Sequence, residues 1–177
     1  MIKRETLNTE KQNDKTIAID QISTAEALKK INDEDQKVSI AVRKALPEIE
    51  KVVNLAKTSL VDGGRVFYIG AGTSGRLGAS ECPPTYSAPS DWFIGIIAGG
   101  DKALRNSIEG AEDKSESAIE DLKKFDITIK DLVIGISCSG AAKYVISALE
   151  YAKEKGSKTA YIITNPVPFL TTKVDVV

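Results

Sequence analysis

Residues 65–85 read R-V-F-Y-I-G-A-G-T-S-G-R-L-G-A-S-E-C-P-P-T, and the interpretation of the whole chain starts from this stretch. Its apolar, aromatic-containing run 66–69 is typical of a buried β-strand. The run breaks directly into the glycine-rich residues 70–75, and a helical pattern begins at Arg76 and Leu77. The stretch therefore predicts a strand, a tight loop and the N-terminus of a helix.

The predicted loop has the features of an anion-binding site. Glycine lets the backbone approach a ligand closely, and the first turn of a helix offers free N–H groups and a dipole that favours negative charge. Thr73 and Ser74 add two adjacent hydroxyl donors. We predict that Gly72, Thr73, Ser74 and Gly75 bind a phosphate group.

Two other interpretations of this loop are available. The loop matches G-x-G-x-x-G, the fingerprint of dinucleotide-binding folds, although a single match is a weak signal. The adjacent hydroxyls argue against it, and so does the run 80–84, which puts Glu81 and a rigid Pro-Pro turn where a dinucleotide fold continues its helix. A glycine turn that only links a strand to a helix is the third interpretation, and it stays open at this point.

The composition is that of an ordinary soluble domain. The chain has 177 residues, 42% hydrophobic and 28% charged, which favours one domain with a sizeable core. Lysine and arginine total 24 against 25 aspartate and glutamate, so the net charge is -1. Because there is no basic excess, we expect neither nucleic acid nor a membrane surface as a partner.

Several functional classes are excluded by residues that the sequence lacks. Residues 1–16 are polar, unlike a signal peptide, and no apolar run approaches the roughly 18 residues of a membrane span. We expect a cytoplasmic protein whose two cysteines, Cys82 and Cys138, are reduced. The chain has no histidine, which excludes Ser-His-Asp and Cys-His catalysis and most zinc chemistry. Carboxylates are the leading candidates for acid–base catalysis, and we expect no metal and no cofactor.

The N-terminal third is predicted to be helical. Residues 1–16 have the composition of a flexible polar lead-in, and a short helix over 25–31 is followed by an acidic corner at 32–35. From 36 to 61 apolar residues recur at helical spacing, with Pro47 either kinking the helix or dividing it. This apolar stripe suits packing on the core or on a second subunit.

Strands and helices alternate in the remainder of the chain. Strands are predicted over 66–69, 92–98, 132–137 and 159–164, with a fifth beginning at 174, and helices over 102–107, 115–125 and 141–155. Because the strands are almost continuously apolar, they predict an α/β fold with a parallel sheet covered by helices on both faces. We assign 61–177 to this domain and 1–60 to a helical segment that packs on it or on a partner subunit.

A second hydroxyl-rich loop, Ser137-Cys138-Ser139-Gly140, follows the third predicted strand. In such sheets ligands collect at the carboxyl ends of the strands, where both loops lie. We predict that Ser137, Ser139 and Gly140 contact a phosphomonoester from the side opposite the glycine-rich loop. A Ser-Gly pair after a strand is also common as a helix cap, so a structural role for this loop stays open.

Several longer motifs occur in a characteristic order. They are I-N-D-E-D, G-A-G-T-S-G-R-L-G, A-S-E-C-P-P-T, G-I-I-A-G-G-D and E-G-A-E-D. From about residue 17 to the end, the chain resembles the N-acetylmuramic acid 6-phosphate etherases, bacterial members of the sugar isomerase (SIS) domain superfamily. The resemblance implies a three-layer α/β sandwich with a doubly wound, flavodoxin-like parallel sheet, and a cytoplasmic homodimer.

The resemblance also implies a lyase of cell-wall recycling. Such enzymes remove D-lactate from N-acetylmuramic acid 6-phosphate and leave N-acetylglucosamine 6-phosphate. A carboxylate base takes the C2 proton of the open-chain sugar, a carboxylic acid protonates the departing ether oxygen, and water adds to the double bond. By motif, Glu81 matches the acid and Glu112 the second catalytic carboxylate, here taken as the C2 base. Arg76 and Ser80 are implied as substrate-binding residues.

Three departures from the family pattern keep other functions open. The family has three more residues between Gly78 and Ala79, it continues Ser-Gly-Arg-Thr-Pro where this chain reads Ser139-Gly140-Ala141-Ala142-Lys143, and it extends past residue 177. We therefore expect a C-terminally truncated member. A non-catalytic phosphosugar-binding module, an inactive fragment and a phosphosugar isomerase are the alternatives, while the presence of Glu81 and Glu112 favours the lyase.

Overall fold

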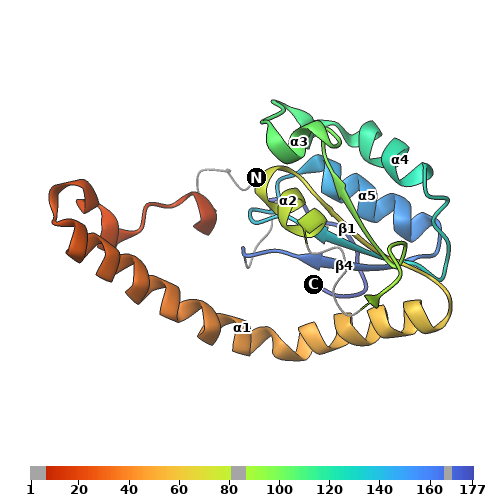
Figure 1. Cartoon of the computed structure of the whole chain (residues 1–177), viewed down its shortest axis with the longest axis horizontal. Helices are drawn as coiled ribbons and strands as arrows, with labels where there is room; N and C mark the ends of the chain where they lie inside the picture. Colours follow the sequence, from red (N-terminus) through yellow and green to blue (C-terminus); the bar gives the residue numbers. More distant parts are fainter. Residues whose placement is uncertain (1–6, 81–86, 166–168) are drawn as a thin grey trace.

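The computed structural model describes residues 7–80, 87–165 and 169–177, and its centre is a four-stranded parallel sheet (Figure 1). The strands are β1 (Val66–Gly70), β2 (Phe93–Ile97), β3 (Leu132–Ile136) and β4 (Lys158–Ile162), in the order β2-β1-β3-β4. In the register, Val66 lies opposite Phe93 on one side and Leu132 on the other. This order is that of a doubly wound, flavodoxin-like sheet, so the predicted fold class is confirmed.

Helices cover both faces of the sheet and make three layers. On one face, α1 (Thr24–Val61) packs its Leu55 and Leu60 on β1 and β3, and α2 (Gly72–Ser80) brings Gly78 against Tyr68. On the other face, α5 (Lys143–Glu154) packs Tyr144 and Leu149 against the core. The helices α4 (Ser115–Lys123) and α3 (Lys102–Arg105) complete this side, as Figure 1 shows.

Helix α1 runs without interruption through the acidic run 32–35, so the predicted corner between two helices is wrong. The helix begins at a capping box, in which the Ser23 hydroxyl accepts from the Glu26 N–H (3.3 Å) and the Glu26 carboxylate accepts from the Ser23 N–H (3.1 Å). Asp and Asn cost little at exposed helical positions, and Glu34 pairs with Lys37. Pro47 lies inside α1, which bends at mid-length instead of dividing (Figure 1).

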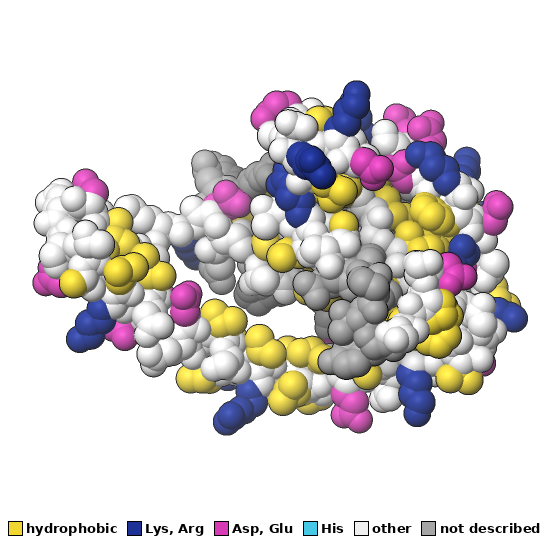
Figure 2. Space-filling model, viewed as in Figure 1, with side chains coloured by type: hydrophobic (Ala, Val, Ile, Leu, Met, Phe, Trp, Pro, Cys, Tyr) yellow, Lys and Arg dark blue, Asp and Glu magenta, His cyan; other side chains and the backbone are white. Residues whose placement is uncertain are grey.

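The two halves of α1 have different surroundings. The C-terminal half packs on the sheet, whereas the N-terminal half projects from the body (Figure 1). Figure 2 shows hydrophobic side chains along this helix. The large apolar side chains exposed on α1 include Leu28, Ile31, Val38, Val42, Leu46, Ile49 and Val53. They recur at spacings of three, four and seven residues, which places them on one face of the helix.

Residues 7–16, predicted as a flexible polar lead-in, form 3₁₀ turns and contact α1 through Glu34. They contain the 3₁₀ turns Asn8–Glu10 and Asp14–Thr16, and a third such turn, Ile19–Gln21, follows. Asn13 donates a side-chain hydrogen bond to Glu34 of α1 (3.2 Å). Hydrogen bonds from Lys37, Lys15 and Asn13 lower the pKa of Glu34 to about 2.

A buried carboxylate joins the starts of β1 and β3. Oδ1 of Asp131 accepts from the Arg65 backbone N–H (2.8 Å) and from Arg65 Nε (3.1 Å). Oδ2 accepts from Arg65 Nη2 (3.0 Å), the Thr128 N–H (2.7 Å) and the Thr128 hydroxyl (3.2 Å). The residue is 1% exposed, and although burial opposes ionisation, these bonds hold the pKa of Asp131 below its ordinary value.

The C-terminal residues differ from the prediction in one respect. The expected fifth strand is a single parallel bridge between Val176 and Ala160 of β4. Within the described ranges, no helix combines the length and apolar character needed to span a bilayer. The division of the chain between residues 60 and 61 stays a prediction.

Candidate functional site

The glycine-rich loop after β1 is shorter than predicted, because α2 begins at Gly72 and not at Arg76. Thr73 and Ser74 therefore lie in the first turn of the helix, where N–H groups lack intrahelical acceptors. Gly72 has φ +55°, a value that favours glycine. A Cβ on Gly75 would lie 2.7 Å from the Gly70 carbonyl oxygen, so only glycine lets the helix start this close to the strand.

The loop after β3 is held by its own hydroxyl groups. Ser137 accepts from the Gly140 N–H (3.2 Å) and Ser139 accepts from the Ala141 N–H (3.3 Å). Gly140 has φ +71°, which turns the chain towards α5. These bonds give the hydroxyls a structural role within the loop, but they do not cap α5, whose N-cap residue is Ala142 and has no side-chain capping bond. The same hydroxyls line a cavity.

The two loops meet where β1 and β3 lie side by side, at the switch point of the doubly wound sheet. Ser74 Oγ and Cys138 Sγ are 3.8 Å apart. Between the loops is a cavity of about 230 Å³, which we call the inter-loop cavity. It is lined by Thr9, Glu10, Ala71, Ser74, Glu112, Ile136, Ser137, Cys138, Ser139 and Ala142.

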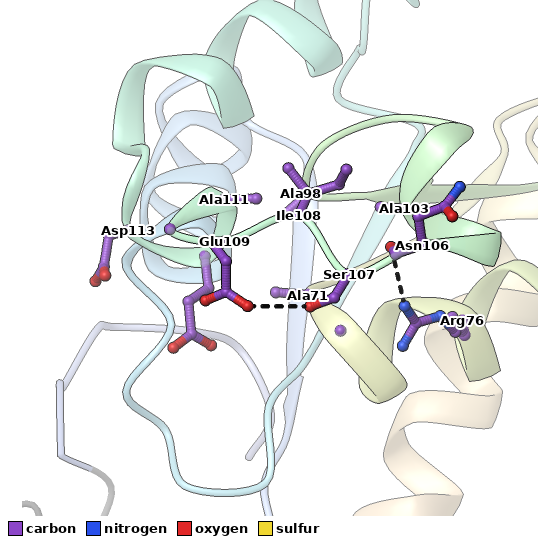
Figure 3. Close-up of a pocket in the computed structure, with 13 residues that line it drawn as sticks. Ala71, Arg76, Ala98, Ala103, Asn106, Ser107, Ile108, Glu109, Ala111 and Asp113 are labelled. Atoms are coloured by element: carbon purple, nitrogen blue, oxygen red, sulfur yellow. Dashed lines mark hydrogen bonds between the residues drawn. The ribbon is translucent and has the colours of Figure 1, made fainter.

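A second cavity of about 330 Å³ shares Ala71 and Glu112 with the first, and we call it the Arg76 cavity (Figure 3). Its polar wall includes Gly72, Arg76, Asn106, Ser107, Glu109, Glu112 and Asp113. The guanidinium of Arg76 donates to the carbonyls of Leu104 (3.2 Å) and Asn106 (3.3 Å). Figure 3 shows Arg76 on one side of this cavity and Glu109 with Asp113 on the other. The main chain thus fixes a cation opposite carboxylates.

The structure brings together most of the residues predicted to form the site. Ser74, Ser137, Ser139 and Glu112 line the inter-loop cavity, and Gly72 and Arg76 line the second cavity with the same Glu112. Neither cavity is lined by Thr73, Gly75 or Gly140, but these residues belong to the two loops that enclose the inter-loop cavity.

Two predicted residues are not joined to this group. Ser80 ends α2, about 12 Å along the helix from Gly72, and its hydroxyl donates to the Leu77 carbonyl (2.9 Å). Ser80 lines neither cavity, and its substrate-binding role stays a prediction. Glu81 lies outside the described residues.

Several lining residues of the inter-loop cavity were not predicted, and two of them come from a distant part of the chain. Thr9 and Glu10 come from the N-terminal segment, which reaches the cavity across more than 60 residues of sequence. No local motif marks them, because their neighbours in the chain are simply polar. Their position depends on the long-range path of the segment past α1.

The charges of the site suit acid–base chemistry. Glu10 and Glu112 contribute carboxylates to the inter-loop cavity, and Glu109, Glu112 and Asp113 contribute them to the Arg76 cavity. Within 7–80, 87–165 and 169–177, no group of three or more His, Cys, Asp or Glu side chains is arranged to hold a metal ion. Carboxyl groups in two protonation states can remove one proton and deliver another.

Comparison with known proteins agrees with this architecture. Residues 48–153 match the family described as glucokinase regulatory protein N-terminal SIS domain. Among solved structures, a phosphoheptose isomerase from Neisseria gonorrhoeae is similar, with a TM-score of 0.63 at 16% identity over 80% of this chain and 75% of that one. A phosphoheptose isomerase from Francisella tularensis has the same TM-score at 19% identity, over 80% and 76%. These likenesses show the fold.

Curated relatives are much closer in sequence. An N-acetylmuramic acid 6-phosphate etherase of Lactococcus lactis subsp. lactis (strain IL1403) is 52% identical over 93% of this chain and 57% of its own length. One from Escherichia coli O1:K1 / APEC is 46% identical over 92% of this chain and 55% of its own length. The chain thus spans little more than half the length of the relatives it matches.

Proposed function

The chain belongs to the family described as glucokinase regulatory protein N-terminal SIS domain, and from the names of its etherase relatives we propose that it binds a 6-phosphorylated amino sugar in its two cavities. We further propose that it cleaves the D-lactyl ether of N-acetylmuramic acid 6-phosphate in the cytoplasm. Relatives about 50% identical carry the etherase name. The observation that carries the proposal is the position of Glu112, which lines both the hydroxyl-rich cavity and the cavity that contains Arg76.

The phosphate is assigned to the hydroxyl-rich end of the inter-loop cavity. There Ser74 comes from the first turn of α2, while Ser137 and Ser139 come from the loop after β3. Hydroxyl groups donate to phosphate oxygens, and the N-terminus of a helix favours an anion. Thr73 lies in the same turn, where the backbone N–H groups lack intrahelical acceptors.

The two glutamates are assigned different steps. Glu112 first takes the C2 proton of the open-chain sugar. The C3–O bond then breaks, and the Glu81 carboxyl gives its proton to the ether oxygen, releasing D-lactate. Water then adds to the double bond: its hydroxyl goes to C3, its other proton returns Glu81 to the acid, and Glu112 returns its proton to C2. The cycle is balanced and leaves both residues as they began.

The direct test incubates the purified chain with N-acetylmuramic acid 6-phosphate in heavy water and measures D-lactate and C2 exchange. We expect Glu81→Gln to lose lactate release but keep exchange, and Glu112→Gln to lose both. Glu116→Gln, an exposed change at the start of α4, is the matched control and should keep both. If the unmutated chain releases no lactate and catalyses no exchange, the lyase assignment is wrong. Exchange without lactate would favour the isomerase.

The phosphate assignment has a separate test. Replacing Thr73 and Ser74 together by alanine should weaken the binding of N-acetylglucosamine 6-phosphate at least about tenfold, or about 1.4 kcal/mol. Calorimetry measures this directly. Unchanged affinity would remove the phosphate from the start of α2.

For assembly, the apolar stripe on the projecting half of α1 supports a homodimer. Side chains such as Val38 and Val42, 59% and 46% exposed, lie one turn apart and are available to a second copy. Light scattering should report a dimer for the unmutated chain and a monomer for Val38→Ser/Val42→Ser. The control Arg43→Ser, also on α1, should stay dimeric. A monomeric unmutated chain would contradict this assignment.

A further inference from the structure

The N-terminal segment 7–10 forms part of the wall of the inter-loop cavity. Leu7 is buried, at 3% exposure, and its carbonyl accepts from the Glu10 N–H (3.0 Å) within a 3₁₀ turn. Thr9 and Glu10 line the cavity together with Ser74 and the loop after β3. The segment therefore presents two polar side chains to the place where the proposed function puts the phosphosugar.

Contacts further along the chain hold this segment in position. The Lys15 ammonium lies 3.2 Å from the Glu34 carboxylate of α1, and the Lys15 carbonyl accepts from Lys30 Nζ (3.0 Å). Leu7 is buried on one side of Glu10, and Lys15 contacts α1 five residues beyond it. The exposed Glu10 therefore lies between two points at which the chain contacts the rest of the molecule.

The charge of Glu10 indicates which part of a ligand it meets. A carboxylate repels a phosphate group, so Glu10 is unsuited to the phosphate position at Ser74, Ser137 and Ser139. An ionised carboxylate only accepts hydrogen bonds. The hydroxyl groups and the acetamido N–H of an amino sugar are donors, and a neutral sugar ring attached to the phosphate reaches beyond the phosphate position. The cavity therefore has an anion-binding end and an acceptor end.

We propose that Glu10 is a specificity-determining residue that accepts hydrogen bonds from the sugar portion of the bound phosphosugar, with the segment 7–10 as its support. The proposal rests on the proposed function for the identity of the ligand. It adds a substrate contact from a part of the chain that lies outside the SIS family match at 48–153. Glu112 keeps the role of C2 base.

The test compares two ligands by calorimetry, using the whole chain. Inorganic phosphate probes the anion-binding end, and N-acetylglucosamine 6-phosphate probes both ends. Glu10→Gln should weaken binding of the amino sugar phosphate about tenfold, because the charged acceptor becomes a neutral amide, while inorganic phosphate binds as tightly as before or more tightly. The control Glu150→Gln, an exposed residue of α5, should change neither affinity.

A second variant tests the support that the segment provides. Leu7→Ala loosens the buried anchor and should lower the affinity for the amino sugar phosphate at least threefold, without changing the affinity for inorganic phosphate. Equal affinities of Glu10→Gln and the unmutated chain for the amino sugar phosphate would overturn the proposal. A rise in affinity for both ligands would also overturn it, since Glu10 would then only repel the anion. If the unmutated chain binds neither ligand, the proposed function fails together with this inference.

Discussion

Replacing Asp131 by asparagine should cost the fold about 3–5 kcal/mol, although the change alters the shape of the side chain very little. The reason lies in the five hydrogen bonds that the carboxylate accepts, two at Oδ1 and three at Oδ2. An asparagine has one oxygen and one NH₂ group. If its oxygen keeps the three bonds at the Oδ2 position, its NH₂ faces the backbone N–H and Nε–H of Arg65, and both of these donors lose their acceptor.

Each lost bond to a charged acceptor is worth about 1.5–3 kcal/mol, so two losses give at least about 3 kcal/mol. Urea unfolding followed by circular dichroism measures the change from the shift of the midpoint at constant slope. The control Glu48→Gln removes an exposed ion pair with Lys51 and should leave the midpoint nearly unchanged. A loss of less than about 1 kcal/mol for Asp131→Asn would refute this account of the clamp. At urea concentrations below its unfolding midpoint, the variant should bind phosphate normally. Asp131 precedes β3 and so lies at the opposite end of the strands from the cavities.

Three further predictions concern the loop, the core and acid stability. In Gly75→Ala the new Cβ would lie 2.7 Å from the Gly70 carbonyl oxygen, closer than the about 3.3 Å of a C–H···O contact, so the start of α2 must move and phosphate binding should weaken. In Gly78→Ala the new Cβ would lie 3.0 Å from the Tyr68 Cβ, away from the phosphate position, and binding should be kept. Equal calorimetric affinities of the two variants would contradict this. Tyr144→Phe removes the hydrogen bond to Asp121 (2.6 Å) and should lower the free energy of unfolding by about 1–2 kcal/mol. The loss is no larger because Asp121 keeps its ion pair with Lys124. An unchanged urea midpoint would contradict this prediction. The folded pKa of Asp131 and of Asp175 lies below the ordinary value of 3.8. Their contribution to stability is therefore present above that pH and is lost as the pH falls through the folded pKa. The urea midpoint should drop as the pH is lowered below 3.8, and by less in Asp131→Asn.

The sheet could be predicted from the sequence because each strand carries its own signal. The runs that became β1, β3 and β4 are short and apolar, and each ends in glycine, serine or asparagine. Their alternation with helices determines a parallel sheet by a general rule of packing. Local signals failed where long-range contacts decide, as in residues 7–16, which are ordered by Leu7 and by their contacts with α1.

The residues at which the helices begin were the second feature that could not be predicted from the sequence. The start of α2 at Gly72 could not be predicted because glycine is a poor helix former. In the first turn of this helix, Gly75 allows the close approach to β1. The acidic run 32–35 was read as a break because Asp and Asn favour caps, yet the capping box at Ser23 had already begun the helix. In both places the tertiary or capping context outweighs residue propensity.

The candidate site could be predicted in its two loops and in Glu112. Ser74, Ser137 and Ser139 follow strands that are neighbours in the sheet, and strand ends in such folds lie together. Glu10 could not be predicted, because nothing near it in the chain resembles a site. Its place depends on the path of the residues that run from the cavity to the start of α1.

The strand order has a consequence for how the chain is made. Of the four strands of this sheet, β1 leaves the ribosome first and becomes a central strand. Its partner β3 begins 66 residues later, at Leu132 against Val66. At a synthesis rate of about 5–20 residues per second, β1 waits roughly 3–13 s for that partner. During this time only β2 can pair with it, and its other edge carries unpaired N–H and C=O groups. Chaperone binding to the nascent chain should therefore concentrate between the appearance of residues 70 and 136, and ribosome profiling of chaperone-bound chains would show this window.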